Sequence, residues 1–262
     1  MNRRDLLESL TAVGLRPEEG LGHVRILLDH RSSRLSRFPP ENGLEDSLVD
    51  FVLSGDYWAG LWVRPSLVVE IAEFEGPRGV PDIFVARIDA ERLITRLNGI
   101  GYWTFGSRSL VRLRLALETA PRGLTLDRLS RRYGGSPRSL SSALEIAEAA
   151  GVISLSGEIV RLSPVVRRFV CDSVAIEAKV RSAPAALSQA YRYRTFSHRV
   201  AILVPNGIRN PATLRDHGVG WLRPTSAEAP WQLRPRRIGP RLRGDALLAE
   251  EALIAHMRAA IA

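Results

Sequence analysis

Cysteine, lysine and long apolar runs are almost absent from this chain of 262 residues. Because Cys171 is the only cysteine, no internal disulfide can form, and a zinc site built from paired cysteines is excluded. No apolar run approaches the roughly 20 residues that a bilayer-spanning helix needs. The first residues also lack the apolar core of a signal peptide. We therefore expect a cytoplasmic protein that has no membrane partner.

Arginine stands almost everywhere that a basic residue occurs: of 37 lysine and arginine residues, 37 − 1 = 36 are arginines. The net charge of +9 and the isoelectric point near 10.8 favour a polyanionic partner, with nucleic acid ahead of a membrane surface. Hydrophobic residues make up 45% of the chain and charged residues 25%, which is typical of a globular protein. The length allows one large domain or two small ones.

The single lysine, Lys179, lies in an apolar stretch from Val174 to Val180 that predicts a β-strand. An ammonium is compact whereas a guanidinium is wide and flat, so we expect this lysine where a point charge must sit beside an oxygen. Side chains two residues apart in a strand share a face, so Lys179 projects beside Glu177. The pair is either a salt-bridged strand edge or part of a site that holds a metal ion and a water molecule.

The first hundred residues are expected to contain helices followed by a strand pair. Residues 1–40 are predicted to be a helical segment, because apolar residues recur at helical spacing. These are Leu6, Leu7, Leu10, Val13, Val24, Leu27 and Leu28. A second helix carries Glu45 near its start, and strands at 66–71 and 80–86 flank a glycine-rich turn. Asp82 stands near the start of the later strand, where a buried carboxylate is costly unless it is paired or binds a metal; a turn-capping role is the alternative.

Residues 106–167 are predicted to form a separate domain of three helices and a hairpin. Its run LTLDRLSRRYGGSPRSLSSALEIAEAAGVI resembles the second helix, turn, recognition helix and first wing strand of a winged helix-turn-helix. The resemblance implies that the third helix enters a major groove while the second lies near phosphates. The residues implied are Arg138, Ser139 and Ser142 on the third helix, and Arg131 and Arg132 on the second. Winged helices also serve as protein-docking modules, and that alternative stays open.

The last section of the chain predicts an α/β fold. After the strand that holds the lysine comes a helix at 184–196, and then a continuous apolar run at 199–205 that suits a buried parallel strand. The order strand, helix, strand defines a βαβ unit. On this helix Gln189 and Tyr193 lie four residues apart and therefore share a face. Two further strands, a basic loop at 234–243 and a closing helix complete the chain.

Three motifs resemble, in order and type, those of the PD-(D/E)XK nuclease superfamily, which has a restriction-endonuclease-like fold. They are Pro81-Asp82, Glu177-Ala178-Lys179, and Gln189 with Tyr193 on the helix that follows. The resemblance implies an αβββαβ core and a site for Mg²⁺, with Mn²⁺ as a substitute, whose ligands are Asp82, Glu177 and the Ala178 carbonyl. Lys179 is implied to hold the attacking water and to stabilise the charge that develops in the transition state.

The spacing of the two implied metal ligands departs from the family, because Asp82 and Glu177 are 177 − 82 = 95 residues apart. We explain the gap by a discontinuous nuclease-like domain, residues 41–105 and 168–262, into which the winged-helix domain is inserted. If the two halves of the chain were independent domains instead, Asp82 could not reach the metal. Asp172 would then be the alternative acid, although it precedes the strand by too little to pair naturally.

The function implied by the resemblance is that of a metal-dependent DNA endonuclease, in which the winged helix binds duplex DNA. Glu45 would act through water or a second metal, although Glu41 and Asp46 compete for that place. DNA repair or defence against foreign DNA would be the setting, and a homodimer is expected if each copy cuts one strand. The alternative is a DNA-binding regulator whose nuclease-like sheet is an inactive scaffold. No P-loop, Rossmann glycine pattern or histidine metal motif competes.

Overall fold

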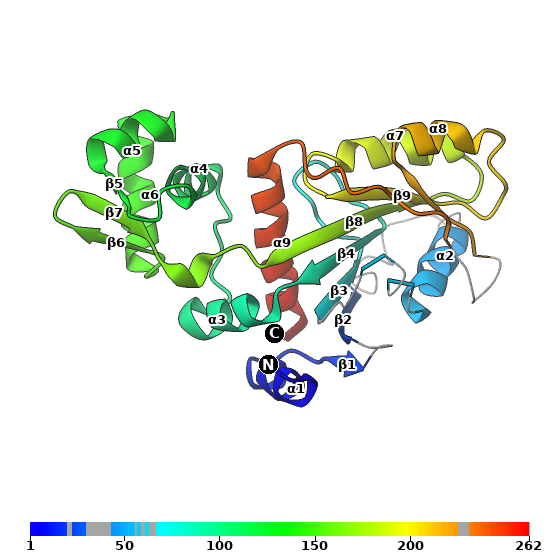
Figure 1. Cartoon of the computed structure of the whole chain (residues 1–262), viewed down its shortest axis with the longest axis horizontal. Helices are drawn as coiled ribbons and strands as arrows, with labels where there is room; N and C mark the ends of the chain where they lie inside the picture. Colours follow the sequence, from blue (N-terminus) through cyan, green and yellow to red (C-terminus); the bar gives the residue numbers. More distant parts are fainter. Residues whose placement is uncertain are drawn as a thin grey trace.

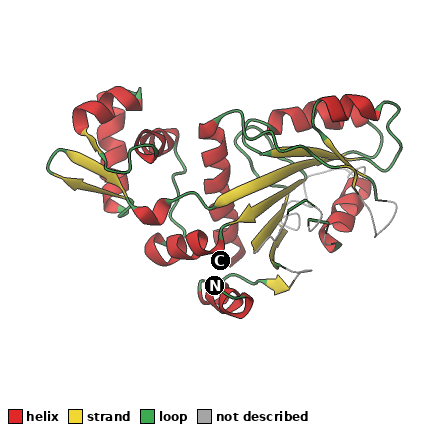
Figure 2. Ribbon diagram, in the orientation of Figure 1, coloured by secondary structure: helices red, strands yellow, loops and turns green. Residues whose placement is uncertain are grey.

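A mixed sheet forms the centre of the molecule, with helices on both faces (Figures 1 and 2). The computed structural model describes residues 1–19, 23–29, 43–55, 57–58, 61–62, 67–224 and 231–261. Within these residues the sheet has eight strands, in the order β1 (Glu18–Glu19), β2 (Val24–Asp29), β3 (Leu67–Ala72), β4 (Ile83–Ile88), β8 (Val170–Ala178), β9 (Arg199–Leu203), β10 (Gly220–Leu222) and β11 (Trp231–Leu233). This arrangement confirms the predicted α/β class.

The described helices are α1 (Arg3–Ala12), α2 (Gly43–Ser54), α3 (Ala90–Ile100), α4 (Arg108–Glu118), α5 (Leu126–Tyr133), α6 (Pro137–Ala149), α7 (Ala183–Tyr193), α8 (Pro211–Asp216) and α9 (Arg243–Ile261). Helices α1, α3, α7 and α9 contribute to the apolar core on one face of the sheet. Helix α2 contributes to the core on the other face. Because both faces are covered, the central strands are buried on both sides; every residue of β3 is buried. Within the described ranges, no helix is long and apolar enough to cross a membrane.

The connectivity makes β4 and β8 neighbours although about eighty residues separate them in sequence. Strand β3 pairs antiparallel with β4, and β4 pairs antiparallel with β8. Strand β8 then pairs parallel with β9 through the crossover helix α7, as the βαβ pattern predicted. The apolar faces of α7 and β8 meet in the core through Ala186, Ala190 and Ala175. Strands β4 and β8 therefore hold their ends in fixed register at the centre of the sheet.

The predicted helical segment at residues 1–40 is wrong between Val24 and Asp29. These residues form β2, which pairs parallel with β3 over its whole length. Residues Val24, Ile26 and Leu28 are buried while their neighbours are less buried, which is the two-residue period of a strand. The apolar spacing fitted a helix as well, but the β-branched residues and the partner strand decide the outcome. Residues 30–42 lie outside the described part.

The three helices and the hairpin predicted for this part of the chain are confirmed. The helices are α4, α5 and α6, and the hairpin is formed by β6 and β7. The side chains of Thr125 and Ser136 cap α5 and α6 by accepting from backbone amides three residues later. Strands β5 (Leu124–Thr125), β6 (Ile153–Ser156) and β7 (Ile159–Leu162) form a small sheet in the order β5-β7-β6. The core of this unit includes Leu247 of α9. Figure 1 shows α9 standing between the unit and the large sheet.

A buried ionic cluster joins this unit to the large sheet, and nothing in the sequence predicted it. Glu251 of α9 accepts from Arg96 of α3 at 2.5 Å and from Arg114 of α4. Glu250 accepts from Arg114 at 2.9 Å and from Arg168, just before β8, at 3.3 Å. Both glutamates are almost fully buried, and two arginines on Glu250 hold the pKa of its carboxyl below the usual range against the effect of burial. The cluster fixes α4 against α9 and the sheet.

Candidate active site at the facing ends of two central strands

The register of the sheet places Asp82 opposite Glu177. Ile83 pairs with Ile176 in the β4–β8 ladder, so the next opposed pair is the residue before β4 and Glu177 on β8. Directly opposed residues of an antiparallel pair project from the same face, with their Cβ atoms roughly 5 Å apart. The long connection between β4 and β8 therefore does not separate the two carboxylates. It leaves the sheet at the other end of the strands.

The Asp82 carboxylate is held by the backbone of β8. Its Oδ2 accepts from the amide of Ala178 at 2.6 Å. Burial raises the pKa of Asp82 to about 7, with a further contribution from the negative charge of Glu177. The amide of Ala178 and the ammonium of Lys179 act in the opposite direction without cancelling the shift. The two carboxylates, Asp82 and Glu177, are thus largely buried side by side. The positive charge near them does not fully compensate for burial and for their mutual repulsion.

Both oxygens of Glu177 have partners, and only 2% of this residue is exposed. Oε2 accepts from the hydroxyl of Tyr193 on α7 at 2.6 Å, and Oε1 lies 3.2 Å from Nζ of Lys179. The Tyr193 oxygen also lies 3.1 Å from the carbonyl of Val80, so it links the helix, the turn before β4 and β8. Burial raises the pKa of Glu177 although the tyrosine and the ammonium oppose it. Tyr193 orients this carboxylate.

Lys179 lies directly after β8 and bridges two acids. Its Nζ is 3.2 Å from Oε1 of Glu177 and 3.2 Å from Oε2 of Glu45 on α2. Burial lowers the pKa of Lys179, but the negative charges of Asp82, Glu177 and Glu45 outweigh burial, so the pKa is raised overall. The side chain therefore stays in its charged ammonium form. Its backbone amide donates to the carbonyl of Leu203 on β9 at 3.0 Å. The parallel neighbour strand thereby fixes the position of the only lysine.

The structure gathers most of the residues predicted for the site. Five side chains meet through the contacts above: Asp82, Glu177, Lys179, Glu45 and Tyr193. Gln189 is half-buried on α7, one turn before Tyr193, and its side chain forms no hydrogen bond with another described residue. Glu41 lies outside the described part of the chain. Asp46 follows Glu45 on α2. The ion pair with the lysine is made by Glu45 rather than by Asp46.

Asp172 does not belong to this group. Its carboxylate is buried and accepts from Trp62 at 3.2 Å and from Arg199 at 3.1 Å, and Arg237 lies 3.4 Å away. In an extended strand, residues five apart project from opposite faces, so Asp172 and Glu177 point apart. The alternative in which Asp172 supplies the missing acid is therefore wrong. This carboxylate neutralises arginines at the other end of β8.

The donors at the strand ends fit a hard divalent cation. In the described ranges, no group of three or more histidine, cysteine, aspartate and glutamate side chains has the spacing of a metal site. Two carboxylates, Asp82 and Glu177, are present. The amide of Ala178 points at Asp82, and in extended backbone the N–H and C=O of one residue point to the same side, so its carbonyl faces that carboxylate too. Two carboxylates and a carbonyl, completed by water, are typical Mg²⁺ ligands.

The two arginines predicted on the second helix of the small unit are exposed. Arg131 forms an ion pair with Asp127 one turn earlier on α5. The guanidinium of Arg132 donates to the hydroxyl of Thr119. Both interactions are at the surface and can exchange for phosphate at little cost, because exposed pairs contribute at most about 1 kcal/mol. The positions are therefore accessible to a nucleic-acid backbone.

The three residues predicted on α6 differ in their exposure. Arg138 and Ser142 are exposed on the outer face of the helix. Ser139 is half-buried, and its hydroxyl lies 2.7 Å from the hydroxyl of Tyr133 and 3.2 Å from that of Ser109. Ser139 thus joins the three helices to each other. Among these three, Arg138 and Ser142 are the side chains that face outward.

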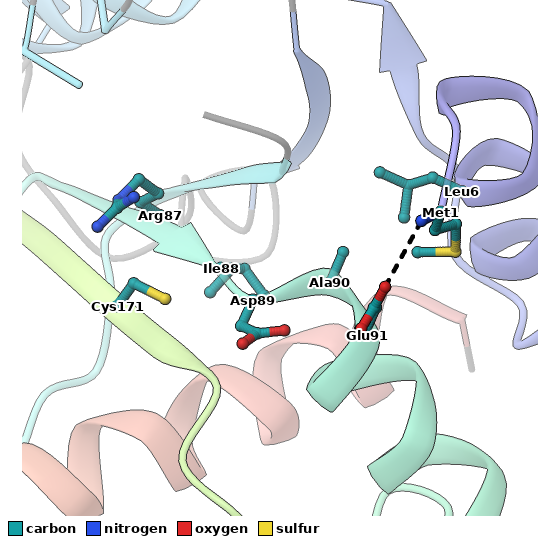
Figure 3. A pocket seen from close by; sticks show the side chains of 8 residues that line it. All are labelled: Met1, Leu6, Arg87, Ile88, Asp89, Ala90, Glu91 and Cys171. Carbon is teal, nitrogen blue, oxygen red and sulfur yellow. Dashed lines mark ion pairs between the residues drawn. The ribbon is translucent and has the colours of Figure 1, made fainter. Parts of the chain in front are cut away.

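A cavity of about 290 Å³ lies near the start of β8 and the end of β4 (Figure 3). Asp82 and Glu177 lie at the opposite ends of these two strands. It is lined by Met1, Arg87, Asp89 and Cys171, among others, and the N-terminal ammonium pairs with Glu91 at 3.5 Å. Burial raises the pKa of the Cys171 thiol, which keeps it protonated and poorly nucleophilic. The cavity is separate from the candidate active site.

A scan against protein-family models found no match, and searches of curated proteins and of solved structures also found none.

Proposed function

We propose that this chain is a metal-dependent DNA endonuclease that hydrolyses phosphodiester bonds. The observation that carries the proposal is the register of β4 and β8, which sets Asp82 opposite Glu177 beside the only lysine. The chain order of α2, β3, β4, β8, α7 and β9 supports a restriction-endonuclease-like core with the small unit inserted between β4 and β8. The basic charge of the chain supports a nucleic-acid substrate.

Each side chain has a separate task in the proposed reaction. Asp82, Glu177 and the carbonyl of Ala178 would hold a Mg²⁺ ion, which neutralises phosphate charge and lowers the pKa of a water molecule. Lys179 places a fixed ammonium beside these carboxylates, where it orients the attacking water and stabilises negative charge on the phosphate. Tyr193 holds the Glu177 carboxylate in place through its 2.6 Å hydrogen bond. Glu45 holds the other side of the ammonium.

The proposal is tested by cleavage of supercoiled and linear duplex DNA in Mg²⁺, Mn²⁺ or EDTA. Wild-type protein should cut in either metal and not in EDTA. Lys179→Ala and Asp82→Ala should each lower the rate at least 100-fold, because each removes charge stabilisation or a metal ligand. Glu45→Gln should also lower the rate, because it removes one of the two acids that hold the ammonium of Lys179. Its matched control is Asp46→Asn on the same helix, which should cut normally.

Two results of the cleavage assay would contradict the proposal. Cutting that persists in both Lys179→Ala and Asp82→Ala would place the activity elsewhere or in a contaminant. Absence of cutting by the wild type on every DNA form, in either metal, would remove the enzymatic function altogether.

A DNA-binding regulator with an inactive nuclease-like sheet is the second candidate. The observation that favours it is the pairing of Glu177, whose two oxygens already have partners in Lys179 and Tyr193. A site satisfied by its own side chains has less need of an ion. Tight DNA binding without cutting would support the regulator.

A further inference from the structure

The basic loop between β11 and α9 is fixed to the rest of the molecule by its backbone. The amides of Ile238 and Gly239 donate to the carbonyl of His198 at 3.1 and 3.2 Å. The amide of Arg241 donates to the carbonyl of Arg194 at 2.8 Å, directly after α7. Figure 1 shows the loop running from β11 along the sheet to the start of α9. Although it has no regular structure, the loop is therefore held in one position.

Part of the charge on this loop is neutralised and part is not. Arg237 lies 3.4 Å from Asp172, and Arg243 pairs with Glu118 of α4 at 3.1 Å. Three other arginines are exposed and have no ion-pair partner among the described residues. They are Arg234, Arg236 and Arg241. The loop thus presents several unneutralised guanidinium groups along one short path.

Beneath the loop, Arg194 is a buried cation without a carboxylate partner in the described part of the chain. It is 7% exposed, its guanidinium donates to the carbonyl of His217 and lies 5.1 Å from the ring centre of Tyr191, and its Nε has no partner. The hydroxyl of Tyr191 is also buried and unpartnered. Burial lowers the pKa of Arg194; Tyr191 opposes this, and the charge of Arg241 adds to it. Two neighbouring cations with no anion of their own would be stabilised by a bound anion.

We propose that residues 234–243, with Arg194 beneath them, form a binding strip for the phosphates of a nucleic-acid backbone. One guanidinium group can donate two parallel hydrogen bonds to the oxygens of a phosphate. A row of guanidinium groups along an extended loop therefore suits a repeating polyanion better than a single small anion. The strip reaches α4 through the Arg243–Glu118 pair, so it lies on the side of the small helical unit.

The inference rests on the proposed function for a role of the strip in cleavage, but the binding of phosphates by the strip can be measured without any cleavage.

The experiment compares two triple variants of the full chain that lose the same charge. The strip variant is Arg234→Gln, Arg236→Gln and Arg241→Gln. The control is Arg4→Gln, Arg16→Gln and Arg258→Gln, which are exposed arginines on α1, on the segment after it and near the end of α9. Binding to a 30-base-pair duplex of random sequence is followed by fluorescence anisotropy in EDTA at several salt concentrations. Cutting in Mg²⁺ is measured in parallel.

The proposal expects the slope of log K against log salt to become shallower by about 2.7 in the strip variant, at about 0.9 for each phosphate that is no longer neutralised. The control should change it by less than one. Equal slopes in the two variants would overturn the strip. Binding to vesicles containing phosphatidylserine, abolished only in the strip variant while the DNA slope stays the same, would also overturn it in favour of a lipid surface.

The two proposals fail separately in this design. Normal cutting with an unchanged salt slope would reject the strip and leave the nuclease standing. A strip-dependent slope in a protein that cuts no DNA would reject the nuclease and leave the strip standing.

Discussion

The carboxyl of Asp82 should weaken the folded protein when it ionises in the absence of metal. Its pKa is raised from 3.8 to about 7 in the folded chain, so folding favours the protonated form. The cost to the free energy of unfolding is absent below pH 3.8, the pKa of the carboxyl in the unfolded chain. This penalty grows as the pH rises and is complete above about pH 7. Three pKa units at about 1.36 kcal/mol each give a penalty of about 4 kcal/mol.

The change that tests this is Asp82→Asn, which keeps an oxygen for the amide of Ala178 and removes the charge. At about pH 5 only about 1.6 kcal/mol of the penalty is present, and at about pH 8 all of it is. The stability advantage of Asp82→Asn over wild type should therefore grow by about 2–3 kcal/mol between these two pH values. We would measure the free energy of unfolding by urea titration and circular dichroism, in EDTA.

Asp216→Asn is the control, because Asp216 is an exposed aspartate at the end of α8 and its substitution should give no growing advantage. Adding Mg²⁺ at about pH 8 should stabilise the wild type and leave Asp82→Asn unchanged. An advantage of Asp82→Asn that stays constant or shrinks as the pH rises would contradict a raised pKa of Asp82 in the folded chain.

Three further outcomes are expected. Glu251→Gln should lower the free energy of unfolding by about 3–5 kcal/mol, since it leaves Arg96 and Arg114 short of a buried partner; urea titration against exposed Glu145→Gln checks this. Lys179→Arg should lose at least 100-fold in cutting rate while binding DNA normally, because a forked guanidinium cannot replace a compact ammonium. Tyr193→Phe should lower the cutting rate about 10-fold with the Mg²⁺ requirement shifted to higher concentration; an unchanged metal titration would contradict its role in orienting Glu177.

The central part of the fold could be predicted because its signals are local. The apolar runs of β8 and β9 with an amphipathic helix between them define a βαβ unit in one continuous segment. The caps at Thr125 and Ser136 likewise mark helix starts that the structure retains. These elements are decided by neighbours in sequence.

Strand β2 and the ionic cluster could not be predicted, because distant partners decide them. Val24 to Asp29 becomes a strand through pairing with β3, some forty residues later. Arg96 and Arg114 look like surface residues of amphipathic helices, and their burial depends on how α9 packs between them. The residue pattern of α4 cannot predict that Arg114 forms an ion pair with Glu251, about 140 positions away.

The candidate site lies between these two cases. Lys179 beside Glu177 follows from the two-residue period of a strand. Asp82 lies near Glu177 because β4 and β8 are neighbours in the sheet. From the sequence, this was expected only because the motifs resemble those of a nuclease superfamily. The sequence favoured Glu45, with Glu41 and Asp46 as competitors, and the ion pair between Glu45 and the lysine depends on how α2 packs on the sheet.

Anomalous diffraction from crystals grown with Mn²⁺ at about pH 8 would show whether a metal ion binds between the two carboxylates. We expect a peak at about 2.0–2.6 Å from oxygens of both Asp82 and Glu177, within reach of the Ala178 carbonyl, and its loss in Asp82→Asn. Crystals that show no manganese between the two carboxylates, from protein that cuts DNA in Mn²⁺, would contradict it.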